Sequence, residues 1–159
     1  MVGKQKGFTI IELIVVIVIL GILAAVAFPR FSGLQVDARV AKAQAAQGAV
    51  NSASALLRAT FIARSPATLA TSVVTEGATI TMCNGYPTAD AAGIIAAARI
   101  SSTDYTLSAG GATPTSAITI DVPGAATAAT CRVTYTGGGG ATCTTAVVAP
   151  TITIAVTTC

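Results

Sequence analysis

The chain has 159 residues, of which 53% are hydrophobic and 9% are charged, with no histidine and a formal net charge of +3. So small a net charge gives no electrostatic reason to expect nucleic-acid binding, and without histidine there is no Ser–His or Cys–His pair for nucleophilic catalysis. The carboxylates are spread singly along the chain, and no phosphate-binding glycine loop opens a helix. We therefore expect no enzyme, no cofactor and no metal site, but one compact domain with a retained apolar segment.

The beginning of the chain combines a basic start, a single acid and a long apolar run. Lys4 and Lys6 come first, Glu12 follows, and the sixteen residues 13–28 carry neither a charge nor a polar side chain. About 20 apolar residues span a bilayer, so residues 8–28 are just long enough for a membrane helix. The lysines would hold its start in the cytoplasm. A carboxylate in such a helix is costly and usually has a specific partner.

Two ordinary explanations leave Glu12 without a role. A plain membrane anchor has no use for the carboxylate. A secretory signal has a short apolar region and a small-residue cleavage site, and Ala25-Val26-Ala27 supplies such a site. A cut after Ala27 would release a secreted soluble binding domain that begins at Phe28.

Residues 6–31, KGFTIIELIVVIVILGILAAVAFPRF, resemble the type IV pilins, whose precursors carry a short basic leader that ends in glycine. The resemblance implies that a prepilin peptidase removes residues 1–7 by cutting between Gly7 and Phe8, on the cytoplasmic side, and methylates the new Phe8 amine. Glu12 would then be the fifth residue of the mature chain, where these pilins keep a glutamate. Loss of the two leader lysines would lower the net charge to +1. The short leader and Phe8 favour the type IVa class.

The chemistry of Glu12 follows from such a cut. A positive amine at Phe8 would lie four residues from the carboxylate, on the same face of a helix. The carboxylate could pair with its own amine or with the amine of a neighbouring subunit, and either pairing costs less than two isolated charges in an apolar medium. We hypothesise that Glu12 neutralises the Phe8 amine of an adjacent subunit during filament assembly.

The helix is expected to begin with an anchor and filament-core segment, residues 8–32, that contains two helix-weakening residues. Gly21 is a poor helix former and Pro29 lacks an N–H, so a bend or a local loss of helix is expected near them. Our sharper hypothesis is a helix break in which residues 21–29 unwind when subunits pack into a filament.

Residues 33–65 are expected to form the amphipathic half of this helix. Apolar, small and polar residues recur at alternating spacings of four and three, which gives one weakly apolar stripe. Ser65-Pro66 predicts the helix stop. The stripe consists of Val36, Val40, Ala43, Gln47, Val50, Ser54, Leu57 and Phe61.

Residues 66–159 are expected to form a globular β domain. Residues 78–82 alternate as a strand does, residues 84–87 form an Asn-Gly-Tyr-Pro turn cluster, and Asp90 suits the N-cap of a short helix over 90–100. A Gly-Tyr-Pro turn before a small-residue helix is similar to major pilins of the mannose-sensitive haemagglutinin type. This region could present a surface loop for subunit contacts or adhesion, or it could simply cover the sheet.

The last forty residues are typical of antiparallel sheet. Four segments alternate and are rich in β-branched residues, separated by Pro123-Gly124, by the four glycines 137–140 and by Pro150. A helix followed by strands predicts an α+β subunit, in which the long N-terminal helix, with its anchor half protruding, packs on a C-terminal antiparallel sheet. The four predicted strands are 117–122, 131–136, 142–148 and 151–156.

The four cysteines, Cys83, Cys131, Cys143 and Cys159, all follow the predicted helix. Their even number and the exported context favour two disulfides over metal binding. We favour Cys131–Cys159, which ties an inner strand to the end of the sequence and resembles the C-terminal disulfide loop of many pilins, with Cys83–Cys143 as the second bond. Cys131–Cys143 with Cys83–Cys159 stays open, because a hairpin would join the first two.

The resemblance implies the major structural subunit of a bacterial type IV pilus, a homopolymeric surface filament for adhesion, motility or DNA uptake. The precursor would reside in the inner membrane and the filament outside the cell. The implied partners are the prepilin peptidase, the assembly motor, the platform and the outer-membrane channel. A pseudopilin of a type II secretion system has the same N-terminal signature and stays an alternative, although the disulfide-closed C-terminal region favours a surface pilus.

Overall fold

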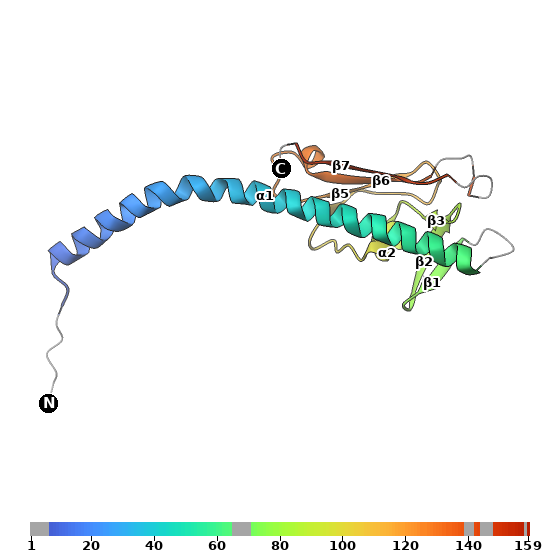
Figure 1. The fold of residues 1–159 in the computed structure, drawn as a ribbon, viewed down its shortest axis with the longest axis horizontal. Coiled ribbons are helices and arrows are strands. Elements are labelled where there is room, and N and C mark those ends of the chain that lie inside the picture. The colour runs from blue at the N-terminus through green and yellow to red at the C-terminus, as the bar shows by residue number, and fades with distance from the viewer. Residues whose placement is uncertain (1–6, 65–70, 139–141, 144–147, 158) are drawn as a thin grey trace, which may run out of the picture. The chain divides into compact units, whose positions relative to one another are not determined.

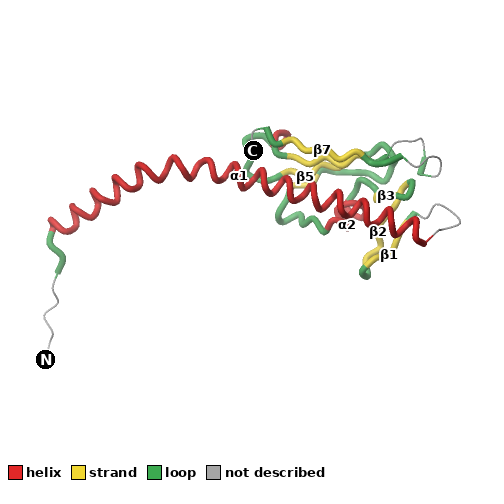
Figure 2. The backbone as a smooth tube through the Cα atoms, in the orientation of Figure 1, coloured by secondary structure: helices red, strands yellow, loops and turns green. Residues whose placement is uncertain are grey.

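The computed structural model describes residues 7–64, 71–138, 142–143, 148–157 and 159. Among these residues a long helix is followed by antiparallel strands in two sheets, which confirms the predicted α+β class (Figures 1 and 2). The chain forms two compact units, residues 1–37 and residues 38–159. The long helix contributes to both.

Helix α1 spans Ile10–Arg64. It includes a stretch that is long and apolar enough to cross a membrane, judged by length and composition. Gly21 and Pro29 both lie inside the helix, so the local loss of helix that we expected near them is not found in the single chain. A proline removes only one intrahelical hydrogen bond, and the flanking turns can continue. Unwinding of residues 21–29 in a filament stays a prediction.

In the second unit, α1 lies against both sheets. Ala46, Val50 and Ala53 pack in one apolar cluster with the larger sheet, whereas Leu57 and Phe61 pack in another cluster with the smaller sheet. Of the predicted stripe in this unit, Val40 and Gln47 are half-buried, and the other five residues are buried, namely Ala43, Val50, Ser54, Leu57 and Phe61. Its first member, Val36, belongs to the first unit and is 39% exposed.

The smaller sheet has the order β1-β2-β3, with β1 at Ser72–Thr75, β2 at Ala78–Cys83 and β3 at Tyr86–Pro87. Strand β2 confirms the strand predicted at residues 78–82, and β1 was not predicted. The turn expected over residues 84–87 is shorter. Asn84 and Gly85 both have left-handed backbone, with φ of 54° and 77°, which closes a two-residue hairpin and lets Tyr86–Pro87 pair as a strand.

The short helix predicted over residues 90–100 is present in a distorted form. One π-helical turn, Ala91–Ile95, leads into α2, Ala96–Ala98. Asp90 is the N-cap, as predicted, and its carboxylate accepts a hydrogen bond of 2.6 Å from the backbone N–H of Gly93. Gly93 itself has non-helical backbone, so the segment is kinked at this residue.

The larger sheet has the order β4-β5-β6-β7, with every neighbouring pair antiparallel. Its strands are β4 at Thr106–Leu107, β5 at Ala117–Asp121, β6 at Arg132–Thr136 and β7 at Thr151–Ala155, and a 3-10 turn at Ala128–Thr130 precedes β6. Three predicted strands agree with β5, β6 and β7 to within one residue at each end. The predicted strand 142–148 mostly lies outside the described residues, as do the predicted helix stop at Ser65-Pro66 and the last two of the four glycines.

Two disulfides close the second unit. They join Cys131 to Cys159 and Cys83 to Cys143, the pairing that the sequence analysis favoured. Cys131 and Cys159 are buried in one cluster with Ala43 of α1. The bond between Cys83 and Cys143 connects residues 60 positions apart and links β2 to the segment that precedes β7.

Two basic side chains fasten loops of the second unit to α1. The Nε of Arg39 donates a hydrogen bond to the carbonyl oxygen of Cys159, and the Nζ of Lys42 donates to the carbonyl oxygen of Asp104 at 2.6 Å. The Lys42 ammonium also lies over the ring of Tyr105, 4.7 Å from its centroid, and the Tyr105 hydroxyl donates to the Lys42 carbonyl oxygen at 3.2 Å. The early part of α1 in this unit is thereby tied to two distant segments.

Candidate processing and assembly site

The predicted cleavage point lies just ahead of α1. Gly7, Phe8 and Thr9 are non-helical, and the helix begins at Ile10. The Phe8 side chain is 89% exposed. The Gly7–Phe8 peptide bond therefore sits in open backbone, where no helical hydrogen bonds protect it.

Thr9 and Glu12 form a capping box at the start of α1. The Thr9 hydroxyl accepts a hydrogen bond of 3.2 Å from the backbone N–H of Glu12, and the Glu12 carboxylate accepts one of 3.1 Å from the backbone N–H of Thr9. The Thr9 hydroxyl also donates to the same carboxylate oxygen at 2.8 Å. This reciprocal arrangement satisfies N–H groups that a helix start otherwise leaves unpaired.

Sequence reasoning missed Thr9. The signal was present, because a threonine followed three residues later by a glutamate, just before an apolar run, is the sequence pattern of a capping box. Glu12 was read only as a charge in need of a cation. The structure shows that its carboxylate already has two donors in its own chain.

The structure brings Phe8 and Glu12 together. Both border the same apolar hollow, together with Leu13 and Val16. The carboxylate is held at Thr9, which is the residue next to Phe8. In the uncut chain the Phe8 nitrogen belongs to a peptide bond, whereas a cut after Gly7 would turn it into an ammonium one residue from a fixed carboxylate. A hydrogen bond between an ammonium and a carboxylate is charge-assisted and is roughly twice as strong as one between neutral groups.

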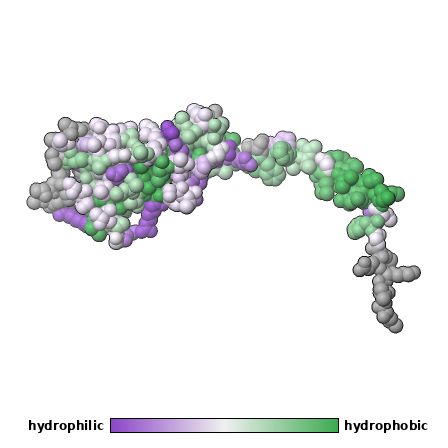
Figure 3. All heavy atoms as spheres, turned by 180° about the vertical axis from the view of Figure 1, so that it is seen from behind, coloured by the Kyte–Doolittle hydropathy of each residue, from purple (hydrophilic) through white to green (hydrophobic). Residues whose placement is uncertain are grey.

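The apolar face of the first unit is bare. The large apolar residues between Phe8 and Phe28 are from 49% to 89% exposed. Figure 3 shows the most hydrophobic surface gathered over this part of α1. Soluble monomers rarely expose so large a contiguous apolar surface, and such surfaces mark contact with protein or membrane.

Residues 3–28 match the family model of the prokaryotic N-terminal methylation motif. The chain is 53% identical over 53 residues to the type IV narrow pilus major component PilA5 of Thermus thermophilus, which covers 33% of this chain and 46% of that protein. Its N-terminal third is that of a type IV pilin. This pilin is also 40% identical over 53 residues to the type IV major fimbrial protein FimA of Dichelobacter nodosus, over 33% and 34% of the two chains.

A third relative is the type IV major pilin protein PilE1 of Neisseria gonorrhoeae, 56% identical over 39 residues, which are 24% of each chain. This pilin thus spans less than half the length of the curated relatives that it matches. No solved structure matches it. The similarity to these proteins lies in the shared N-terminal segment. What is said of the second unit rests on the structure alone.

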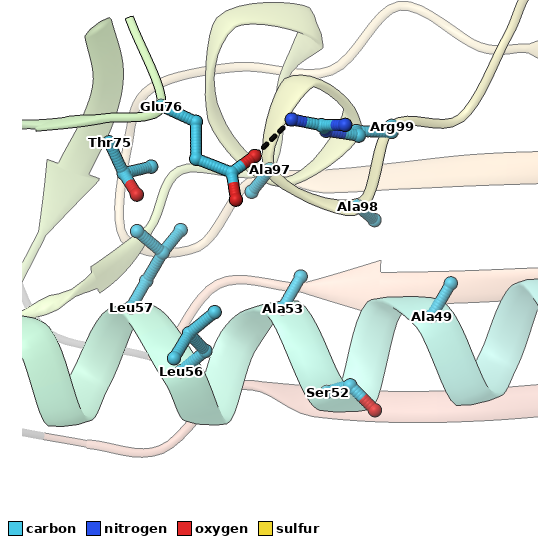
Figure 4. A pocket seen from close by; sticks show the side chains of 10 residues that line it. All are labelled: Ala49, Ser52, Ala53, Leu56, Leu57, Thr75, Glu76, Ala97, Ala98 and Arg99. Atoms are coloured by element: carbon cyan, nitrogen blue, oxygen red, sulfur yellow. Dashed lines mark hydrogen bonds and ion pairs between the residues drawn. The ribbon is translucent and has the colours of Figure 1, made fainter. Parts of the chain in front are cut away.

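A second feature of this pilin is a pocket of about 420 Å³ in the second unit (Figure 4). Its floor is apolar and comes from α1 and α2. Glu76, in the turn between β1 and β2, and Arg99, just after α2, form an ion pair at its mouth. The apolar lining consists of Ala49, Ala53, Leu56, Leu57, Ala97 and Ala98.

The ion pair at this mouth rests on unusual backbone. Glu76 and Arg99 have φ of 47° and 53°, the left-handed region that glycine and asparagine ordinarily fill. That conformation costs a residue with a side chain roughly 1–2 kcal/mol. The two side chains are 70% and 75% exposed, and an exposed pair contributes only about 0.2–1 kcal/mol. The pair therefore does not offset the strain of its own backbone.

Within the described residues, no group of three histidine, cysteine, aspartate or glutamate side chains is placed to hold a metal ion. The cysteines that sequence reasoning considered as ligands are in disulfides.

Proposed function

We propose that this pilin is the major structural subunit of a bacterial type IV pilus, and that it polymerises through residues 8–28 into a surface filament. The observation that carries the proposal is the bare apolar first half of α1, headed by a carboxylate in a capping box. An apolar helix that stays exposed among the described residues needs a bilayer or copies of itself. A filament supplies the copies and the inner membrane holds the precursor.

Maturation is the first step of this proposal. A prepilin peptidase cuts between Gly7 and Phe8 and methylates the Phe8 amine, in keeping with the match to the methylation motif. The apolar helix is retained after the cut. An assembly motor, a platform and an outer-membrane channel then act on the membrane-held subunit, as the resemblance to type IV pilins implies.

Glu12 has the second role. Its carboxylate pairs with the Phe8 ammonium of an adjacent subunit and so sets how far one helix is displaced along the next. The hydrogen bonds from Thr9 favour this role, because they hold the carboxylate at the first turn and reduce the cost of keeping it in apolar surroundings.

Apolar burial alone does not drive the helix from membrane to filament. Lipid tails are as apolar as leucine, so packing between helices and polar contacts must supply the difference. The pairing of Glu12 with the Phe8 amine is the polar contact that only a cut and assembled subunit can make. Cutting is thereby coupled to polymerisation.

The test is the mature N-terminus in purified filaments. Filaments sheared from cells that express the full chain should contain a subunit that begins at Phe8 and carries one added methyl group, by N-terminal sequencing and intact mass. A subunit that begins at Phe28 would overturn the proposal in favour of a secreted soluble domain. Methylated Phe8 without long extracellular fibres by electron microscopy would overturn it in favour of a pseudopilin. We propose a type IVa pilus of the mannose-sensitive haemagglutinin type, with adhesion, motility or DNA uptake as its role.

A further inference from the structure

The pocket beside Glu76 and Arg99 serves no step of the proposed maturation. Its ion pair is exposed and is placed there by two strained backbone positions, which is where recognition is commonly found. Below the charges, Leu56 of the apolar floor is 66% exposed. Figure 4 shows Glu76 and Arg99 turned toward one another over the side chains of α1. The surface therefore offers an apolar seat with one charge of each sign at its edge.

The first unit of the same chain carries the complementary pattern. Arg30, Leu34 and Asp37 lie at spacings of four and three on one face of α1, so the leucine stands between a positive and a negative charge. All three side chains are exposed, Leu34 by 58%. The neighbouring Phe31 is 63% exposed. Within the described part of the chain, neither Arg30 nor Asp37 forms an ion pair.

We propose that the pocket is the docking site for residues 30–37 of a second copy of this chain. Leu34 of the incoming helix lies on the apolar floor. Its Arg30 pairs with Glu76, and its Asp37 pairs with Arg99. The Glu76–Arg99 pair is kept and becomes the centre of a row of four alternating charges, and such networks are stronger than isolated surface pairs.

The dimensions agree with this contact. Arg30 and Asp37 are seven positions apart, which is about 10 Å of rise, so each can reach a different member of the Glu76–Arg99 pair. The contact joins residues near 34 of one copy to residues near 53 of the next, so the two surfaces are different. A head-to-tail contact between two different surfaces extends into a fibre when its rotation does not close into a ring.

This inference rests on the proposed filament and adds the lateral contact that the N-terminal segment does not supply. Its test uses charge exchange in the full chain. The variant E76R/R99E keeps one charge of each sign at the pocket and keeps their mutual pairing, but it faces like charges on an incoming helix. The variant R30E/D37R creates the same conflict from the other side.

Each exchange should lower the yield of sheared filaments at least about tenfold relative to the membrane-held subunit, because like charges then meet. Combining all four substitutions should restore the yield to within about twofold, since the double-mutant logic isolates the pairing itself. The control is Ser102→Arg, which places a charge at an exposed position outside the pocket and should leave the yield unchanged. Non-reducing peptide maps that show both disulfides establish that each variant is folded.

A second measurement decides the matter if an exchange variant fails to fold. Arg30→Lys supplies an amine that a carbodiimide can join to a carboxylate in assembled filaments. Filaments grown from a mixture of isotopically light and heavy subunits should yield a mixed peptide that links position 30 to Glu76. Equal assembly of the exchange variants, no rescue in the combined variant, or a link from position 30 to another acid would overturn the docking. If wild-type filaments form in the same experiment, the proposed pilus function stands even when the docking contact is overturned.

Discussion

Helix α1 runs through both units of this chain, and its apolar residues are buried in the second unit but exposed in the first. In the second unit α1 buries Ala43, Val50 and Leu57 against two sheets, and two disulfides close the structure. In the first unit the large apolar residues of α1 are at least 49% exposed up to Phe28, and the helix start satisfies only its own polar groups. The second unit is explained by contacts within the chain, whereas the first needs a bilayer or further copies.

Blocking the cut should have the largest effect on assembly. Gly7→Val should leave residues 1–7 attached, because the resemblance assigns the peptidase a requirement for glycine there, and fibres should be absent. A Cβ at Gly7 would have no atom within 4 Å, so the fold is unaffected. Intact mass of the membrane-held subunit measures the retained leader. Gly21→Ala, also in open space, is the control that should be cut normally.

The next effect is on assembly alone. Glu12→Ala should leave a stable, cut membrane protein whose filament yield falls at least about 100-fold, since removing one partner of a buried ion pair leaves the Phe8 ammonium uncompensated at a cost of roughly 3–5 kcal/mol. Filament yield is measured by shearing and immunoblotting against the membrane pool. Glu12→Asp, which keeps the charge on a shorter side chain, should lose less. A normal yield of Glu12→Ala filaments would remove the pairing from the proposal.

Removing a disulfide should destabilise the second unit and leave the first unit unchanged. C131S/C159S should lower the free energy of unfolding of the second unit by about 2–4 kcal/mol, because the bond closes a loop and holds two buried residues. The helix of the first unit should be unchanged in detergent. Urea unfolding followed by tyrosine fluorescence, and circular dichroism of the helix, separate the two responses. Equal losses in both signals would show that the units are not independent.

A smaller effect is expected from a hydrogen bond that links the two sheets. The Tyr135 hydroxyl donates a 2.8 Å hydrogen bond to the carbonyl oxygen of Pro87, and burial raises the pKa of that hydroxyl above its usual value of about 10. Tyr135→Phe should cost about 1–3 kcal/mol, since the buried carbonyl loses its donor.

The same residue makes stability depend on alkaline pH. Because its pKa is higher when folded than when unfolded, the stabilisation is complete below pH 10 and is lost as pH rises above the unfolded value. Urea midpoints of the wild type should therefore fall between pH 10 and pH 11, and those of Tyr135→Phe should fall less. Parallel curves for both proteins would contradict the assignment to Tyr135.

Sequence patterns predicted the structure of segments that are long or chemically unusual. An isolated glutamate beside an apolar run was visible at once, and the spacing from Ala43 to Phe61 predicted the buried face of α1. Strands β5, β6 and β7 alternate over five residues each, so their pattern was readable.

What could not be predicted depends on short elements and on the meeting of distant ones. Strand β4 has two residues and β1 has four, which is too short for alternation to be distinctive. The pairing of Glu76 with Arg99 joins two turns 23 residues apart and requires left-handed backbone that neither residue type suggests. The role of Thr9 could have been predicted, because the capping-box pattern is present in the sequence. Only the charge of Glu12 was interpreted.

The fastening of α1 by Arg39 and Lys42 has a mechanical consequence. A fibre held at one end and pulled at the other transmits its tension along the helices. In the proposed filament, tension along α1 would act on the second unit near Arg39 and Lys42, which donate hydrogen bonds to the carbonyl oxygens of Cys159 and Asp104. Cys159 is covalently bound to Cys131, which immediately precedes the inner strand β6, whereas Asp104 lies two residues before the edge strand β4, so the load enters the larger sheet at an inner and at an edge strand.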